Sequence, residues 1–287
     1  MVDLTAQLLH FFSRLPLTEI LRLMKGITLL IILPTALISC SGPRIKTYDL
    51  GDWNQTKIER LLDEASTIQN PGQKIAFISA AFLKTPYLAD TLIGSSETTE
   101  LFVLRLDGVD CFTLLDYVEA LRRSSTFDEF KETLRRTRYR KGQIDFLHRN
   151  HFFSEWGNHD FSQLQDVTAL VGGMSVRRVE KQLNQKGDNT LYLPGYPVKK
   201  RDVAFIPPEA IDTSVLARLS NGDYVGIYSP FSGLDVSHTG IIIKNDEKVL
   251  LRHASSRALL RKVIDEELAP YLGGEKGLVV YRAIVEE

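Results

Sequence analysis

The 287-residue sequence contains very little cysteine and has no excess of charge of either sign. Cysteine occurs twice, at Cys40 and Cys111, so a disulfide-stapled fold is excluded. Lys and Arg number 35 and Asp and Glu number 36, which gives a formal net charge of −1. A nucleic-acid-binding surface needs a clear basic excess, so we expect no nucleic-acid partner. Hydrophobic residues make up 44% of the chain and charged residues 25%, as in ordinary globular proteins.

Cys40 ends a segment that has the layout of a secretion signal. Lys25 precedes an almost wholly apolar run at residues 27–38, and the last residues before Cys40 have the shape of a lipobox. The run is too short to cross a membrane, which takes ~20 residues. A buried core helix is the alternative interpretation of this run.

The signal interpretation sets the boundaries of the chain. It predicts a signal segment at residues 1–39, with the translation start at Met24, and a tether at residues 40–51 that is lipidated on Cys40. We therefore expect a membrane-anchored lipoprotein of the cell envelope that faces the periplasm. One thiol, that of Cys111, then remains in a compartment where a free thiol is a liability.

Residues 52–287 are predicted to form a single α+β domain. Apolar residues recur at helical spacing after Asn54, and Pro71-Gly72 is predicted to end that helix before a second one begins near Gln73. Further helices are predicted to follow Asp110 and Thr126. Strands are expected at residues 224–229, 238–244, 249–252 and 278–282, whereas residues 138–212 show no regular pattern. Helices followed by an antiparallel sheet indicate the α+β class.

Cys111 lies where a loop is predicted to turn into a helix. Free backbone N–H groups and the positive end of the helix dipole converge at such a position, and both stabilise a thiolate. The same N–H groups can bind the oxyanion of a tetrahedral intermediate. The alternative is that Cys111 is a small buried hydrophobic residue.

A nucleophilic cysteine needs a base, and two histidines are placed to supply one. His238 opens an apolar strand and His253 closes the next. If Asn245-Asp246 is a two-residue hairpin turn, the two histidines lie directly opposite each other. A four-residue connection moves them to a diagonal on the same face, and a three-residue connection puts them on opposite faces. One histidine oriented by another fits the cysteine form of a catalytic triad.

Two other interpretations of these residues remain open. His238 and His253 could be ordinary strand-end histidines, or they could ligate zinc together with Cys111. The zinc interpretation lacks the tight local spacing of structural sites. We expect neither a metal nor a cofactor.

Five segments in and around these residues form a recognisable set of motifs: Phe82-Leu83-Lys84-Thr85-Pro86-Tyr87, Asp110-Cys111-Phe112-Thr113, Arg149-Asn150-His151-Phe152, Asp235-Val236-Ser237-His238-Thr239-Gly240 and His253-Ala254-Ser255. Together they resemble the motifs of the NlpC/p60 superfamily of papain-like cell-wall cysteine hydrolases. More narrowly, they resemble its N-acetylmuramoyl-L-alanine amidase-like branch, over about residues 75–285.

The resemblance implies a papain-like fold, with the cysteine at a helix start packed on a sheet that bears the histidines. It also implies a catalytic triad of Cys111, His238 and His253. It assigns five residues to substrate binding: Tyr87, Asp110, Arg149, His151 and Trp156. For His151 and Trp156 the alternative is that they are partly buried anchors of a long loop.

The function that this resemblance implies is hydrolysis of an amide in peptidoglycan or muropeptides, and we expect cleavage at the bond between N-acetylmuramic acid and L-alanine. One alternative is an endopeptidase that cuts the stem peptide between D-glutamate and the diamino acid. Another is a peptidoglycan-binding lipoprotein without turnover, although a pure binder has no need of a reactive thiol.

Overall fold

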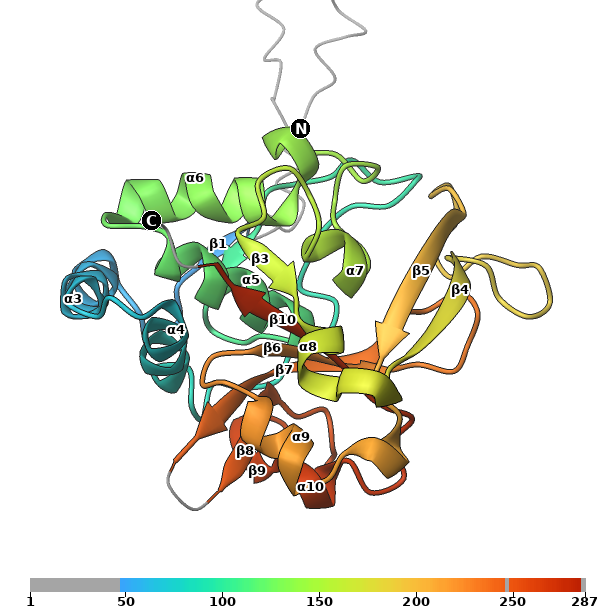
Figure 1. The fold of residues 1–287 in the computed structure, drawn as a ribbon. Helices are drawn as coiled ribbons and strands as arrows, with labels where there is room; N and C mark the ends of the chain where they lie inside the picture. Colours follow the sequence, from blue (N-terminus) through green and yellow to red (C-terminus); the bar gives the residue numbers. More distant parts are fainter. Residues whose placement is uncertain (1–46, 246–247, 285–287) are drawn as a thin grey trace, which may run out of the picture. The chain divides into compact units, whose positions relative to one another are not determined.

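The computed structural model describes residues 47–245 and 248–284 (Figure 1). These residues belong to one compact unit that spans Lys46–Glu287. The predicted signal segment, the start at Met24 and the lipidated Cys40 lie outside the described residues. No helix in the described part is long and apolar enough to cross a membrane.

Four long helices come early in the chain and short ones follow. The helices are α3 (Gln55–Ser66), α4 (Pro71–Ala80), α5 (Cys111–Arg122), α6 (Phe127–Arg138), α7 (Phe153–Trp156), α8 (Thr168–Gly172), α9 (Thr213–Arg218) and α10 (Leu268–Tyr271), with 3₁₀ turns η1 (Arg140–Gly142), η2 (Gly173–Ser175) and η3 (Pro208–Ala210).

The strands are mostly in the second half of the chain. They are β1 (Tyr48–Asp49), β2 (Leu104–Arg105), β3 (Leu164–Asp166), β4 (Arg177–Leu183), β5 (Lys199–Phe205), β6 (Tyr224–Tyr228), β7 (Val236–Lys244), β8 (Val249–Ala254), β9 (Val263–Glu267) and β10 (Leu278–Ala283).

Six of these strands form one sheet in the order β3-β10-β6-β7-β8-β9, and every neighbouring pair is antiparallel. The prediction of an α+β fold with an antiparallel sheet is thus confirmed. The sequence did not predict β3, β9 or the β4–β5 hairpin, which falls in the stretch that looked irregular. In that hairpin β4 begins with four exposed residues, so it lacks the apolar alternation by which strands are recognised.

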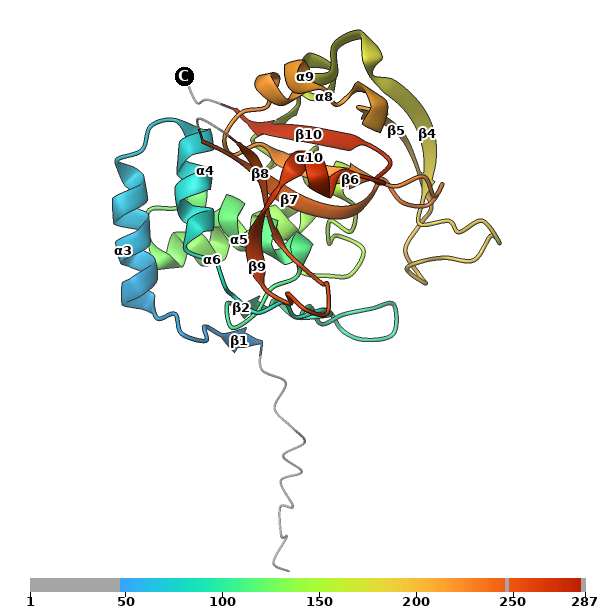
Figure 2. The same ribbon diagram turned by 90° about the horizontal axis from the view of Figure 1, so that it is seen from below.

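The sheet has an apolar cluster on each face. Helices α3, α4, α5 and α6 lie on one side of it, and α8 and α9 on the other (Figure 2). Alternation along β6 produces this division, because Tyr224 and Tyr228 join the first cluster while Val225 and Ile227 join the second. Strand β7, which carries His238, is therefore sandwiched between two cores.

The starts of the helices follow their capping residues. Asn54, Asn70 and Thr126 each accept a hydrogen bond from a backbone N–H of the first turn of the helix that follows. The prediction that Pro71-Gly72 ends the first helix is wrong. Helix α3 already ends at Ser66, and Pro71 is the first residue of α4, where its missing N–H costs no helical hydrogen bond.

Candidate active site

Cys111 is the first residue of α5, and Asp110 caps this helix. Oδ1 of Asp110 accepts hydrogen bonds from the N–H groups of Phe112 (3.0 Å) and Thr113 (2.7 Å), and from the Thr113 hydroxyl (2.8 Å). The Thr113 hydroxyl oxygen accepts from the Asp110 N–H at 3.0 Å, which completes a capping box. Asp110 was predicted to bind substrate, but in the structure its side chain caps the start of α5.

This cap also limits the oxyanion site expected at the helix start. Two of the first N–H groups of α5 already donate to Asp110. In the described part of the chain, the N–H of Cys111 has no carbonyl or carboxylate acceptor. Of these three N–H groups, that of Cys111 is the one left to bind an oxyanion.

The thiol of Cys111 lies against Thr239 of β7. The Thr239 hydroxyl donates to the Cys111 carbonyl oxygen at 2.8 Å, and hydrogen bonding by Thr239 favours the thiolate. Burial and the Asp110 carboxylate nevertheless outweigh this, and they raise the pKa of Cys111 to about 11. The expectation of a thiolate stabilised at the helix start is therefore not met, and the resting residue is a neutral thiol.

His238 and His253 lie on one face of β7 and β8. Lys244 pairs with Val249, so four residues connect the paired ends, and the two-residue turn at Asn245-Asp246 is wrong. The reason is local: the Asn245 side chain accepts from the Lys248 N–H at 2.8 Å, and this closes the connection one residue later. The histidines consequently occupy the diagonal that a four-residue connection predicts, with Nε2 of His238 2.7 Å from Nδ1 of His253.

Gly240 makes room for this pair. An ideal Cβ at Gly240 would lie 2.9 Å from the Arg252 carbonyl oxygen and 3.2 Å from the Cβ of His253. A side chain there would push β8 away from β7. Glycine in the middle of this strand thus allows the close approach of the two strands that carry the histidines.

The second neighbour of His253 was not predicted from the sequence. Its Nε2 lies 2.7 Å from Oε2 of Glu266 on β9, and Nη1 of Arg257 donates to Oε1 of Glu266 at 2.7 Å. Strand β9 carries three acidic residues in a row, which resembles a solvated edge more than a site. The alternation of β9 beside β8 is the signal that could have identified Glu266.

Both imidazoles are kept neutral by their surroundings. Burial, reinforced by His253, lowers the pKa of His238 to about 3. Burial also lowers the pKa of His253, although Glu266 opposes the shift. The ring of Tyr271 covers the pair, with centroids 5.1 Å from His253 and 6.3 Å from His238.

One cavity, of about 240 Å³, brings Cys111 and His238 together. Tyr271 also indicates that Cys111 and His238 are close to each other. Its ring lies against His238, and the nearby Cys111 sulfur contributes to raising its pKa. Within residues 47–245 and 248–284, no hydrogen bond joins the thiol to an imidazole. Such bonds are often long before substrate binds. The cavity is lined by Cys111, Phe112, His151, Phe152, Phe153, Tyr192, Leu193, Leu234, Asp235, Val236, Ser237, His238 and Thr239.

Two of the predicted substrate-binding residues lie beside Cys111. His151 lines the cavity, and one of its ring nitrogens, Nε2, lies 2.7 Å from the Phe146 carbonyl oxygen. Burial and Arg149 lower the pKa of His151 to about 4. Tyr87 pairs with Val109 in an isolated bridge, and its pKa is raised by burial and by the nearby Cys111.

The other two lie away from the cavity. Arg149 forms an ion pair with Glu100 at 3.0 Å and donates to the Gly94 carbonyl oxygen, so it ties two loops together. The side chain of Trp156 is 1% exposed, and its Nε1 donates to Asp116 at 3.1 Å. The structure thus places Trp156 in the core rather than at a binding surface, as the loop-anchor alternative predicts.

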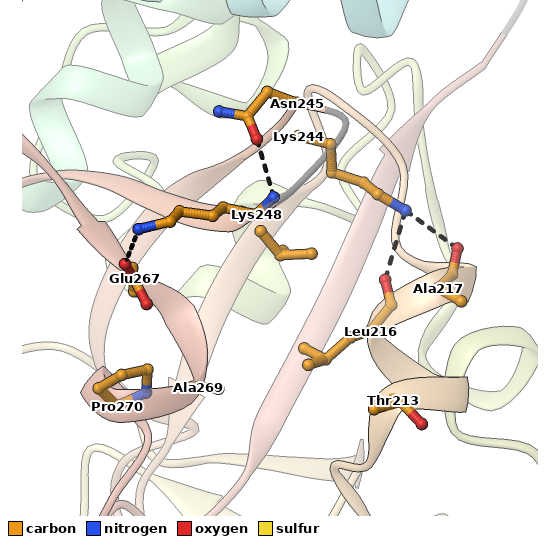
Figure 3. A pocket seen from close by; sticks show the side chains of 10 residues that line it. Thr213, Leu216, Ala217, Lys244, Asn245, Lys248, Glu267, Ala269 and Pro270 are labelled. Atoms are coloured by element: carbon orange, nitrogen blue, oxygen red, sulfur yellow. Dashed lines mark hydrogen bonds and ion pairs between the residues drawn. The ribbon is translucent and has the colours of Figure 1, made fainter.

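The cavity in Figure 3 is separate from this site, and neither cysteine nor histidine is among its lining residues. Nζ of Lys244 donates to carbonyl oxygens at the end of α9, among them Ala217 at 3.0 Å, and Lys248 pairs with Glu267. The contacts of Lys244 are typical of a capped helix end. In the described residues, no group of three or more His, Cys, Asp or Glu side chains is arranged to hold a metal ion.

The comparisons with known proteins agree with a hydrolase site. The family model for N-acetylmuramoyl-L-alanine amidase-like proteins matches residues 77–278, and the chain belongs to this family. An N-acetylmuramoyl-L-alanine amidase from Bacteroides uniformis has a similar structure, with a TM-score of 0.63 and 28% identity over 74% of this chain and 98% of that one. The family is one of amidase-like peptidoglycan hydrolases.

A protein from Legionella pneumophila shares the fold. Its TM-score is 0.68, at 23% identity over 80% of this chain and 94% of that one. No curated protein matches the chain.

Proposed function

We propose that this protein is a cysteine-dependent amidase that cleaves the bond between N-acetylmuramic acid and L-alanine in peptidoglycan or its fragments. The observation that carries the proposal is the cavity shared by Cys111 and His238, with His253 hydrogen-bonded behind His238. The catalytic triad is Cys111, His238 and His253. A cysteine at a helix start beside an antiparallel sheet that bears the histidines is a papain-like arrangement.

The protonation states suggest how the reaction starts. Thiol and imidazole are both neutral at rest, since the pKa of Cys111 is about 11 and that of His238 about 3. We therefore infer that proton transfer accompanies the attack: the sulfur bonds to the carbonyl carbon as His238 takes the thiol proton. The N–H of Cys111 donates to the oxyanion.

The tetrahedral intermediate then collapses. The C–N bond breaks, and His238 returns its proton to the leaving amine nitrogen of L-alanine. Water, deprotonated by His238, next attacks the thioester carbonyl carbon, and the thiol leaves with the proton. The N-acetylmuramic acid side is released as a carboxylic acid.

Tyr87 and His151 are the residues we assign to substrate contact, because each lies beside the cysteine or its cavity. Phe112, Leu193 and Leu234 give the cavity an apolar wall. No metal or cofactor takes part in the proposed steps.

The experiment that tests the proposal is incubation of the purified protein with defined muropeptides, followed by mass spectrometry of the products. Release of an intact stem peptide with a free L-alanine amine is the expected result. Cleavage after D-glutamate would identify the endopeptidase alternative. Absence of any cleavage, with the muropeptide bound, would identify a binding protein.

We also propose that Cys40 is lipidated and that the protein is anchored in the cell envelope, facing the periplasm. Two acyl signals on one residue provide stable anchoring where a single chain does not. Cys40→Ser is expected to release the protein from the membrane fraction while the rate of muropeptide cleavage stays the same. Unchanged fractionation of the variant would contradict the anchor.

A further inference from the structure

Three polar side chains on three neighbouring strands form a continuous chain of hydrogen bonds. Nε2 of His238 (β7) lies 2.7 Å from Nδ1 of His253 (β8), and Nε2 of His253 lies 2.7 Å from Oε2 of Glu266 (β9). His253 is directly opposite Ile264, so Glu266, two residues further on, lies on the same face of the sheet. The chain ends on Arg257, whose Nη1 donates to the second oxygen of Glu266 at 2.7 Å.

The donors and acceptors along this chain determine one another. An ionised carboxylate only accepts, so Nε2 of His253 carries a hydrogen. His253 is neutral, because burial lowers its pKa, and its Nδ1 is therefore a lone pair. A lone pair can be matched only by an N–H, so Nε2 of His238 carries a hydrogen as well. The remaining nitrogen of His238, Nδ1, then has the free lone pair.

We infer that Glu266 is a positioning residue which, acting through His253, holds His238 in the tautomer whose Nδ1 accepts the Cys111 proton. Its catalytic consequence rests on the proposed amidase function. Glu266 does not touch the substrate or the reacting atoms. Its effect passes through His253, whose side chain is only 2% exposed, so little water competes for its ring nitrogens.

Arg257 gives Glu266 a defined orientation, and this makes the inference testable. In Glu266→Gln, the amide oxygen should turn to Arg257, because the guanidinium can only donate. The amide NH₂ then faces Nε2 of His253, and this nitrogen must accept a hydrogen bond from it. This reverses each donor and acceptor along the chain and leaves a hydrogen on Nδ1 of His238, where the base is needed.

The expected result is a fall in kcat on a muropeptide of about 10²–10³-fold in Glu266→Gln, with little change in KM, because a histidine held in the wrong tautomer cannot act as base. The matched control is Glu267→Gln. Glu267 is the next residue of β9 and points to the other face, where it pairs with Lys248 (Figure 3), and this variant should keep wild-type kcat.

A second substitution should restore part of the activity. In Glu266→Gln with Arg257→Ala, the amide is free to rotate and its oxygen can again accept from His253. We expect kcat to rise about tenfold above that of the single variant. A merely structural role for Glu266 predicts the opposite, because removing a second partner can only loosen the site further. A double variant no faster than Glu266→Gln would overturn the inference.

Nitrogen-15 NMR of the histidine rings reads the tautomer without substrate. In the wild type the hydrogen of His238 should be on Nε2, and in Glu266→Gln on Nδ1. A hydrogen on Nδ1 in the wild type, or an unchanged pattern in the variant, would overturn the inference. If the wild type cleaves no muropeptide, the proposed function fails, while these spectra still decide the role of Glu266.

Discussion

Two regions of this protein were predicted from sequence to form its site, and they have different roles in the structure. The strand pair β7–β8 carries His238 and His253, whose rings meet at 2.7 Å. Segment 149–156, which includes the short helix α7, carries Arg149, His151 and Trp156, of which only His151 lines the cavity. The first region supplies the proposed catalytic groups, whereas most of the second holds loops and core together.

The difference lies in how strongly the local structure determines side-chain direction. Along a strand, alternate residues point to one face, so two histidines in paired strands either share a face or do not. Segment 149–156 has no such periodicity over most of its length. There a polar or aromatic residue can point into the core, as Trp156 does, or toward the cavity, as His151 does.

The largest effect is expected at Cys111, the proposed nucleophile, whose replacement should remove activity without changing stability. Cys111→Ala should abolish muropeptide cleavage, because no other group of the proposed site can form the acyl intermediate. The fold should be unchanged, since the exchange removes one atom beside Thr239. The measurement is kcat, with circular dichroism to establish folding. Full activity in the folded variant would eliminate the cysteine mechanism.

Replacing either histidine of the pair should lower kcat, and the fall should be larger for His238 than for His253. His238→Ala removes both the base and the later acid, and should lower kcat by about 10²–10⁴-fold. His253→Ala should cost less, since an orienting residue does not itself transfer the proton. Steady-state kinetics of both variants on one muropeptide test this order. A His253 variant as inactive as Cys111→Ala would mean that its role is misassigned.

Replacement of Trp156 should lower stability and leave activity unchanged, the opposite of what is expected for Cys111→Ala. Trp156→Ala leaves a large hole in the core and the Asp116 carboxylate without one of its donors, so the free energy of unfolding should fall by about 3–5 kcal/mol. Urea titration measures the loss, and kcat per folded molecule should stay near the wild-type value. The control is Phe231→Ala, an exposed aromatic whose loss should change stability little. A fall in kcat without a fall in the free energy of unfolding would instead support the predicted role of Trp156 in substrate binding.

His151 should couple stability to pH. Its pKa is about 4 in the folded protein, below the usual value of 6.5, so the unfolded chain binds more protons between these values. Stability from this residue is present above about pH 6.5 and is lost as pH falls toward 4. His151→Gln should reduce the loss of unfolding free energy between pH 7 and pH 4.5 by about 1–3 kcal/mol. Identical losses in variant and wild type would contradict the shift.

The smallest effect concerns the carboxylate of Asp110 next to Cys111. Asp110 raises the pKa of Cys111, second only to burial, while its side chain caps α5. Asp110→Asn keeps a capping oxygen but removes the charge, so the thiolate fraction at neutral pH should rise severalfold. The rate of Cys111 alkylation by iodoacetamide, measured from pH 7 to 11, reads this. A rate profile that does not move would show that the carboxylate has no influence on the thiol.

Many of the helices and strands could be predicted because residues close together in the sequence determine them. The start of α5 follows from Asp110 and Thr113, and β6, β7, β8 and β10 follow from runs of apolar residues. The sequence left the β7–β8 connection open between two, three and four residues, and the structure has the four-residue connection, in which the Lys248 N–H donates to the Asn245 side chain. Connections of two and four residues both place the histidines on one face, because both have an even number of residues.

What could not be predicted depends on contacts between distant segments. Glu266 becomes part of the site only when β9 pairs with β8 in one particular register. The neutral thiol of Cys111 follows from burial, which a sequence pattern at a helix start does not reveal. The burial of Trp156 likewise depends on Asp116 and Tyr224, one from α5 and the other from β6.

The position of β10 has a consequence for how the protein is made. Among the strands of the described residues it comes last along the chain, yet it lies between β3 and β6 inside the sheet. While residues 278–283 are still missing from a growing chain, β6 has an open edge and β3 has no partner, and such edges tend to pair with other chains. Strand β9, with Glu266, also comes late. The six-stranded sheet is therefore completed only after its other five strands have been made, and His253 gains its partner Glu266 only once β9 has paired with β8.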